Sequence, residues 1–186
     1  MTMKLDDQDR AALLRIARRT IESFLGDGTR PVFEDVGPRL LEPGGAFVTL
    51  HAEGQLRGCI GTFEVTHPLA ETVSRMAVAA ATSDPRFPPV RPEELPEIEI
   101  EISVLSPRHR ILDPGEVQVG VHGLHVQRGT RRGVLLPQVP VEAGWDRETF
   151  LDHTCRKAGL PPEAWRDPST LIEVFTAEVF GEHPPR

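Results

Sequence analysis

The residues with the clearest chemical potential lie in the stretch Leu56-Arg57-Gly58-Cys59-Ile60-Gly61. In an extended strand the side chains of residues i and i+2 point to the same face, so Arg57 and Cys59 are expected to share a surface. A guanidinium beside a thiol lowers the pKa of the thiol and favours the nucleophilic thiolate. Gly58 and Gly61 let another backbone or a ligand approach closely. The stretch therefore predicts a site in which Cys59 and Arg57 do the chemistry and the two glycines line the ligand-binding surface.

Other residues supply anion-binding and acid–base groups. Asp84 lies two residues before Arg86 in a proline-rich, extended segment, where it can orient the arginine. Arg86 and Arg132 are expected to hold an anionic group, because a guanidinium binds carboxylates and phosphates through two parallel N–H donors. His122, beside a glycine in an expected turn, is the best available general base for the thiol.

The second cysteine and the histidine pair do not predict a catalytic or metal site. Cys155 shares an apolar helical stripe with Leu151 and Ala158, so a packed core position is expected. The spacing of His122 and His125 does not place both rings on one strand face, and no third ligand is evident. No metal and no cofactor are therefore predicted.

The composition limits the class of protein. The 186 residues, 39% of them hydrophobic and 26% charged, suit one domain or two small lobes that share a core. A formal net charge of −7 disfavours a general nucleic-acid or anionic membrane surface. Two cysteines make no disulfide framework, and no apolar segment has the length of a signal or membrane span. We expect a cytoplasmic protein.

Local patterns predict helices and strands that alternate along the chain. The first helix is capped by Asp6 or Asp7 and carries an apolar stripe from Leu14 to Leu25, and the second is capped by Thr66. The strand 97–105 alternates isoleucine or valine with glutamate or serine, which is typical of one buried and one solvated face. The remaining expected elements are a hairpin of 124–127 with 133–136, a helix over about 146–158 and a strand over 171–180.

The hairpin that carries Cys59 is predicted from two strands, 46–51 and 56–60, joined across residues 52–55. With His51 opposite Leu56, a regular ladder places Val48 opposite Cys59. On that register His51 points to the opposite side of the sheet from the thiol. His51 is therefore not expected to serve as its base.

An ordered series of motifs resembles the AMMECR-one-like domain family, known in bacteria and archaea as the A component of the AmmeMemoRadiSam system. The motifs are GAFVTL at 45–50, LRGCIG at 56–61, DPRFPPV at 84–90, EIEISVLSP at 99–107, HGLHV at 122–126, RRGVLLPQV at 131–139, GWDRETFLDHTCRKAGLP at 144–161 and AEVF at 177–180. Gln138, in the sixth motif, joins the predicted ligand-binding residues. Val121 departs from the pattern, since a lysine is expected before the His-Gly pair.

The resemblance implies an α+β fold with two unequal lobes, each a mainly antiparallel or mixed sheet layered with helices, and a cleft between them. We expect a single domain of two packed lobes over residues 5–181, followed by a polar tail at 182–186. The resemblance also implies that LRGCIG forms an active or binding site near that cleft. A Memo-like protein and a radical-SAM enzyme are the implied partners. The chain itself lacks the Cys-x-x-x-Cys-x-x-Cys cluster of a radical-SAM enzyme.

Two interpretations of the site remain open. In the first, the chain is an enzyme or the catalytic subunit of a modification system, with Cys59 as nucleophile, Arg57 as the cation that favours the thiolate, and Arg86 or Arg132 holding an anionic substrate group. In the second, the chain is a binding or adaptor module whose LRGCIG surface recognises a partner protein or a small anionic ligand without turnover. Nucleic-acid binding is disfavoured by the acidic net charge.

Overall fold

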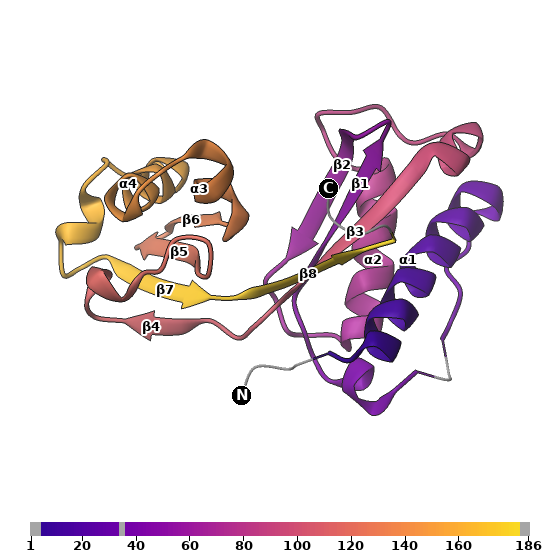
Figure 1. Cartoon of the computed structure of the whole chain (residues 1–186), viewed down its shortest axis with the longest axis horizontal. Coiled ribbons are helices and arrows are strands. Elements are labelled where there is room, and N and C mark those ends of the chain that lie inside the picture. Colours follow the sequence, from indigo (N-terminus) through magenta and orange to yellow (C-terminus); the bar gives the residue numbers. More distant parts are fainter. Residues whose placement is uncertain (1–4, 34–35, 183–186) are drawn as a thin grey trace. The chain divides into compact units, whose positions relative to one another are not determined.

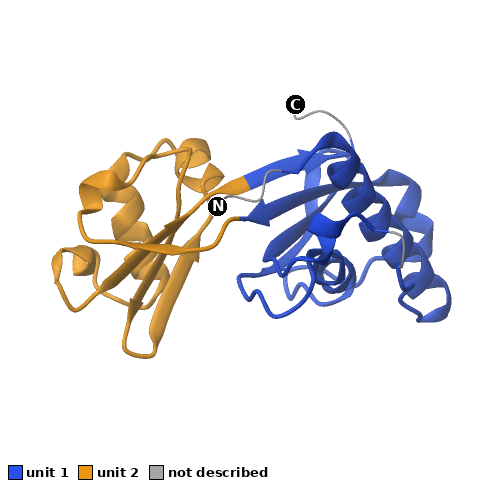
Figure 2. Ribbon diagram, turned by 90° about the horizontal axis from the view of Figure 1, so that it is seen from below, with its two compact units in different colours: residues 1–105, 178–186 blue, residues 106–177 orange. Residues whose placement is uncertain are grey.

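The computed structural model describes residues 5–33 and 36–182. The chain forms two compact units, one of residues 1–105 and 178–186 and one of residues 106–177 (Figure 2). Each unit contains a four-stranded sheet, with strand order β2-β1-β3-β8 in the first and β4-β7-β5-β6 in the second. All the strand pairings described in these sheets are antiparallel, which confirms the predicted α+β fold.

The first unit contains two long helices and four strands (Figure 1). Its elements are α1 (Asp7–Asp27), β1 (Ala46–Ala52), β2 (Gln55–Thr62), α2 (Leu69–Thr82), β3 (Ile98–Leu105) and β8 (Ala177–Gly181). Short 3-10 helices span Pro38–Leu41 and Pro92–Glu97. Helix α2 packs on β1 and β2, and α1 packs on α2 and β3, so both helices cover the same face of the sheet.

The ends of α1 follow from its sequence. The Asp6 side chain accepts hydrogen bonds from the backbone N–H groups of Gln8 and Asp9, which confirms the predicted N-terminal cap. Gly28, in a left-handed conformation with φ of 79°, ends the helix. The most deeply buried side chains are Leu13, Ile16, Ala17, Thr20 and Ile21, so the buried stripe begins one residue earlier than predicted.

Helix α2 starts differently from the prediction. No side chain caps its first turn, which follows Pro68, because the Thr66 hydroxyl is directed to the His67 ring at 2.8 Å. The small side chains of the alanine-rich run of α2 allow close packing on the sheet. Ala77, Ala80 and Ala81 are all buried.

The second unit places one helix against the hairpin of its sheet. Its elements are β4 (His109–Ile111), β5 (Gly123–Arg128), β6 (Arg131–Leu135), α3 (Gln138–Ala143), α4 (Arg147–Lys157) and β7 (Leu171–Phe175), with 3-10 helices at Pro114–Glu116 and Ala164–Arg166. Helix α4 packs on β5 and β6 and is capped by Asp146, as predicted. Cys155 is fully buried in this core, which confirms the predicted packing role, and burial raises the pKa of its thiol.

The predicted single strand over residues 171–180 is wrong. The chain forms two strands, β7 and β8, that are interrupted at Thr176 and belong to different sheets. The Thr176 backbone is hydrogen-bonded to Ser106, which precedes β4. The strand-like composition of residues 171–180 predicted an extended conformation. It did not predict that the chain passes from one sheet to the other at Thr176.

No helix within the described ranges has the length and apolar character needed to cross a membrane.

Candidate functional site

The hairpin of β1 and β2 contains a β-bulge that changes the predicted register. His51 pairs with Leu56, as predicted, but Leu50 pairs with Gly58, so Arg57 is the extra residue. Beyond the bulge, Cys59 lies opposite Thr49 rather than Val48. The predicted register is therefore wrong by one residue from the bulge onwards, and the i, i+2 rule that placed Arg57 and Cys59 on one face does not hold across this interval.

Gly58, which follows the bulged Arg57, lies against helix α2. A Cβ atom at this position would lie 2.2 Å from the carbonyl oxygen of Ala80 in α2, so only glycine allows the strand and helix to approach this closely. At Gly61 a Cβ atom would lie 2.2 Å from the Phe47 ring. The space beside Gly58 is therefore filled by the α2 backbone, and the space beside Gly61 is filled by the Phe47 ring.

The Cys59 side chain lies on the helix-free face of the sheet. Ala46, Val48 and Leu50 of β1 are fully buried toward the helices, so the alternating Thr49 points to the other face, and its pairing partner Cys59 shares that face. The Thr49 hydroxyl donates a hydrogen bond to the Cys59 sulfur at 3.2 Å. The cysteine is free and half-buried, in contrast to the fully buried Cys155.

Asp84 holds the backbone of Cys59 from a segment 25 residues further along the chain. Its carboxylate accepts the Cys59 N–H at 2.9 Å and the Arg86 N–H at 3.0 Å, and its side chain is only 2% exposed. The Arg86 guanidinium also binds it, through Nε at 3.0 Å and Nη2 at 2.7 Å. These bonds, those from the Arg86 side chain above all, hold the pKa of Asp84 well below its usual range. Asp84 thus orients Arg86, as predicted.

Arg86 is the cation beside the thiol. The hydrogen bond with Asp84 raises the pKa of the Arg86 guanidinium, and the charge interaction with Cys59 adds a smaller contribution in the same direction. The Arg86 side chain remains 56% exposed although one edge of the guanidinium is bound to Asp84. The other edge can therefore receive an anion from solvent.

Arg57 is directed elsewhere. Its guanidinium binds both carboxylate oxygens of Glu94, at 3.0 and 3.2 Å, and donates to the carbonyl oxygens of Pro88 and Pro89. This pairing lowers the pKa of Glu94 to about 2, with the Arg57 hydrogen bond as the largest cause. Arg57 therefore links the segment after Asp84 to the edge strand β2 through hydrogen bonds. Its positive charge is paired with the carboxylate of Glu94.

His51 is a residue of this face that the sequence interpretation rejected. In β1 it lies two positions after Thr49, so it points to the same face as Thr49 and Cys59. The prediction that His51 and Cys59 lie on opposite sides is wrong because it assumed an unbroken ladder. A glycine inside a strand indicates a bulge, and Gly58 was the signal that could have corrected the register.

The other predicted site residues lie in the second unit. The Nδ1 atom of His122 faces the backbone N–H of Gln118 at 3.2 Å, and burial, followed by the nearby His109, lowers the pKa of its ring. Arg132 is exposed on β6. Gln138 begins α3, and its buried Oε1 has no hydrogen-bond partner in the described part of the chain. The structure brings together Cys59, Asp84 and Arg86 within the first unit.

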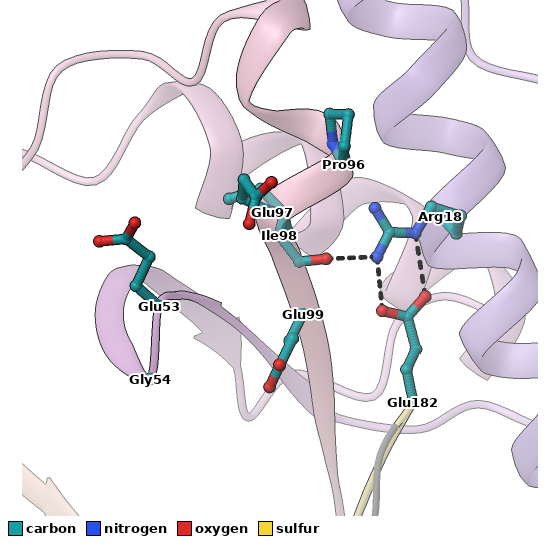
Figure 3. A pocket seen from close by; sticks show the side chains of 8 residues that line it. All are labelled: Arg18, Glu53, Gly54, Pro96, Glu97, Ile98, Glu99 and Glu182. Carbon is teal, nitrogen blue, oxygen red and sulfur yellow. Dashed lines mark hydrogen bonds and ion pairs between the residues drawn. The ribbon is translucent and has the colours of Figure 1, made fainter.

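An acidic pocket of about 670 Å³ is lined by residues of α1, of the turn between β1 and β2 and of the start of β3 (Figure 3). Arg18 of α1 donates to Glu182 through Nε at 2.9 Å and to the Ile98 carbonyl at 2.6 Å. The other carboxylates that line the pocket belong to Glu53, Glu97 and Glu99. Glu182, which sequence analysis assigned to the polar tail, is thus bound to the core unit, and residues 183–186 of that tail lie outside the described residues.

No group of three or more His, Cys, Asp or Glu side chains suited to a metal ion occurs among residues 5–33 and 36–182.

Comparisons with known proteins agree over nearly the full length. A family model described as AMMECR1 matches residues 14–180. A protein of Thermococcus gammatolerans is 48% identical, with 98% of this chain and 95% of that protein covered. A protein of Methanopyrus kandleri is 46% identical, with 100% of this chain and 94% of that protein covered. The crystal structure of the uncharacterized protein PH0010 from Pyrococcus horikoshii has a TM-score of 0.91 at 44% identity and covers 98% of this chain and 95% of its own.

Proposed function

The chain belongs to the AMMECR1 family, and from that premise we propose that it is an enzyme, or the catalytic subunit of a modification system, with Cys59 as its nucleophile. The observation that carries the proposal is the half-exposed free thiol whose backbone is held by a buried carboxylate. A nucleophile acts best from a fixed position, because an undirected side chain loses the advantage of orientation. The Asp84 carboxylate, which lies outside β2, holds the Cys59 backbone in place through a hydrogen bond.

The sulfur of Cys59 has a hydrogen-bond donor and a cation in its surroundings. The Thr49 hydroxyl donates to it, and the Arg86 guanidinium is near enough for a charge interaction. A hydrogen-bond donor and a cation both stabilise a thiolate relative to a thiol. Arg86, rather than the Glu94-bound Arg57, is therefore the cation to which we assign this effect.

The substrate class follows from the free edge of Arg86. A guanidinium that is already oriented by Asp84 can bind a carboxylate or phosphate group with little further ordering. We propose a substrate with such an anionic group close to the electrophilic atom that Cys59 attacks. His122, Arg132 and Gln138 remain predictions from the sequence, and the Memo-like and radical-SAM partners rest on the family resemblance.

The first test measures the reactivity of both cysteines. The intact protein is alkylated with iodoacetamide between pH 5 and 10 (roughly the span in which thiols titrate), and the labelled cysteine is located by peptide mass. We expect Cys59 to react in the folded protein. Cys155, its internal control, should react only on unfolding. If Cys59 also required unfolding, it would not be a nucleophile.

A binding module is the second candidate function. The observation that favours it is that the cations of this surface are already paired, Arg57 with Glu94 and Arg86 with Asp84, as in a rigid recognition surface. This function predicts that Cys59→Ala leaves complex formation with a Memo-like partner intact and that Arg86→Ala weakens it. A Cys-dependent reaction predicts that Cys59→Ala abolishes activity. Titration of the partner with each variant separates the two functions.

A further inference from the structure

The helix-free face of the first sheet places a histidine beside the proposed nucleophile. Cys59 lies directly opposite Thr49, and His51 follows Thr49 by two positions on the same face of β1. His51 and Cys59 are therefore diagonal neighbours across the strand pair. In a regular ladder diagonal positions are separated by about 7–8 Å, a distance that aromatic and other long side chains can span, and here the bulge at Arg57 lies between Cys59 and Leu56, the residue opposite His51.

His51 differs from the other described histidines in its lack of a partner. No hydrogen bond, ion pair or ring contact holds its half-buried side chain within the ranges that the structure describes. The remaining rings contact neighbours, with His67 between Thr66 and Arg75, His109 against His122, His122 at Gln118, His125 at Glu173, and His153 stacked on Trp145.

The charged groups around this pair come from β3 and from the segment after α2. On β3, Glu99 lies opposite His51 and Glu101 lies opposite Thr49. From the segment after α2, Arg86 interacts with Cys59 and is itself paired with Asp84. Carboxylates therefore lie on the His51 side of the pair, and a guanidinium lies on the Cys59 side.

We propose that His51 accepts the proton of Cys59. The S–H bond of Cys59 breaks, its electron pair stays on sulfur, and the proton binds a ring nitrogen of His51. The thiolate that results keeps the hydrogen bond from Thr49 and the attraction of Arg86. The inference rests on the proposed nucleophilic role of Cys59 and replaces His122, whose Nδ1 already faces a backbone N–H, as its base.

The test compares three single variants of the full chain. His51→Gln removes the titrating ring, His122→Gln removes the rival base, and His153→Gln, on α4 of the second unit, is the matched control. The rate of Cys59 alkylation by uncharged iodoacetamide is measured against pH for each. We expect His51→Gln to lower the alkylation rate near pH 7 about tenfold. The His153→Gln control should match the parent protein, and a loss of rate in His122→Gln without a loss in His51→Gln would assign the base to His122 instead.

Each outcome decides a separate question. If Cys59 of the folded parent protein reacts and His51→Gln leaves the rate unchanged, the role of His51 is overturned while the nucleophile stands. If Cys59 of the folded parent protein is unreactive, the proposed function fails and the role of His51 fails with it. Addition of free imidazole to a His51→Ala variant is the second measurement. Recovery of the rate supports the base, because a purely structural role would not be restored in this way.

Discussion

Both units pack a hairpin on a helix through a glycine, yet they use their cysteines in opposite ways. Gly58 of β2 lies against the backbone of α2, and Gly133 of β6 lies against the backbone of α4. The hairpin of β5 and β6 keeps a regular register, whereas the hairpin of β1 and β2 contains the bulge at Arg57. Cys155 is buried between α4 and its sheet, and Cys59 lies on the face that no helix of its unit covers.

The difference shows what makes a cysteine available for chemistry. The two side chains have the same intrinsic reactivity, but burial raises the pKa of Cys155 by more than the nearby Arg128, itself paired with Asp167, lowers it. Cys59 has a hydroxyl donor, a held backbone and the neighbouring Arg86. Position relative to the helix layer, more than residue type, therefore separates the two.

The largest expected effects on stability come from the glycine that each hairpin packs against a helix. Gly58→Ala and Gly133→Ala would place a Cβ atom 2.2 Å and 2.5 Å from helix backbone atoms, so each should lower the free energy of unfolding by about 3 kcal/mol. Urea unfolding measures the change. The matched control is Gly26→Ala in α1, where nothing lies within 4 Å and the stability should stay equal or rise slightly. Equal stability of Gly58→Ala would refute the close packing of Gly58 on α2.

The next largest expected difference is between the stabilities of the two cysteine variants. Cys155→Ser puts a hydroxyl in the fully buried core of the second unit and should cost about 2 kcal/mol of unfolding free energy. Cys59→Ser, at a half-buried position, should change it by no more than about 0.5 kcal/mol. Thermal or urea denaturation of both variants provides the comparison. A loss at Cys59 as large as that at Cys155 would assign Cys59 to packing.

Acid should weaken the first hairpin through Glu94. Its pKa is lowered from 4.5 to about 2 in the folded protein, so its contribution to stability is complete above pH 4.5 and disappears as the pH falls toward 2. Glu94→Gln should therefore be less stable than the parent protein at pH 7 and approach it at pH 2. Urea midpoints at several pH values follow this convergence. Parallel curves would show that the Arg57–Glu94 pair does not stabilise the fold.

The smallest effect is expected at Thr49. Thr49→Val keeps the shape of the side chain and removes the donor that lies 3.2 Å from the Cys59 sulfur. The alkylation rate of Cys59 near pH 7 should fall about two- to threefold, the weight of one modest hydrogen bond. Thr130→Val, at the exposed turn of the β5–β6 hairpin, is the control. An unchanged rate in Thr49→Val would show that the Thr49 hydroxyl does not contribute to the reactivity of Cys59.

Much of the fold was predictable because its signals are local. The Asp6 and Asp146 caps, the hairpin turns and the alternating pattern of β3 each depend on residues within a few positions of one another. The capping of α2 was not predictable in the same way, because Thr66 has an alternative partner in His67. The separation of β7 from β8 also required the path of the whole chain.

The sequence by itself determined the family, the fold class, the burial of Cys155 and the choice of Cys59, Asp84 and Arg86 as residues of interest. Only the tertiary structure decided which of them meet. The contact of Gly58 with α2 joins separate elements, and the hold of Asp84 on Cys59 spans 25 residues. Arg57 pairs with Glu94 for the same long-range reason. Periodicity reports the direction of side chains within one element, whereas register and ion pairing depend on elements that come together after the chain has folded.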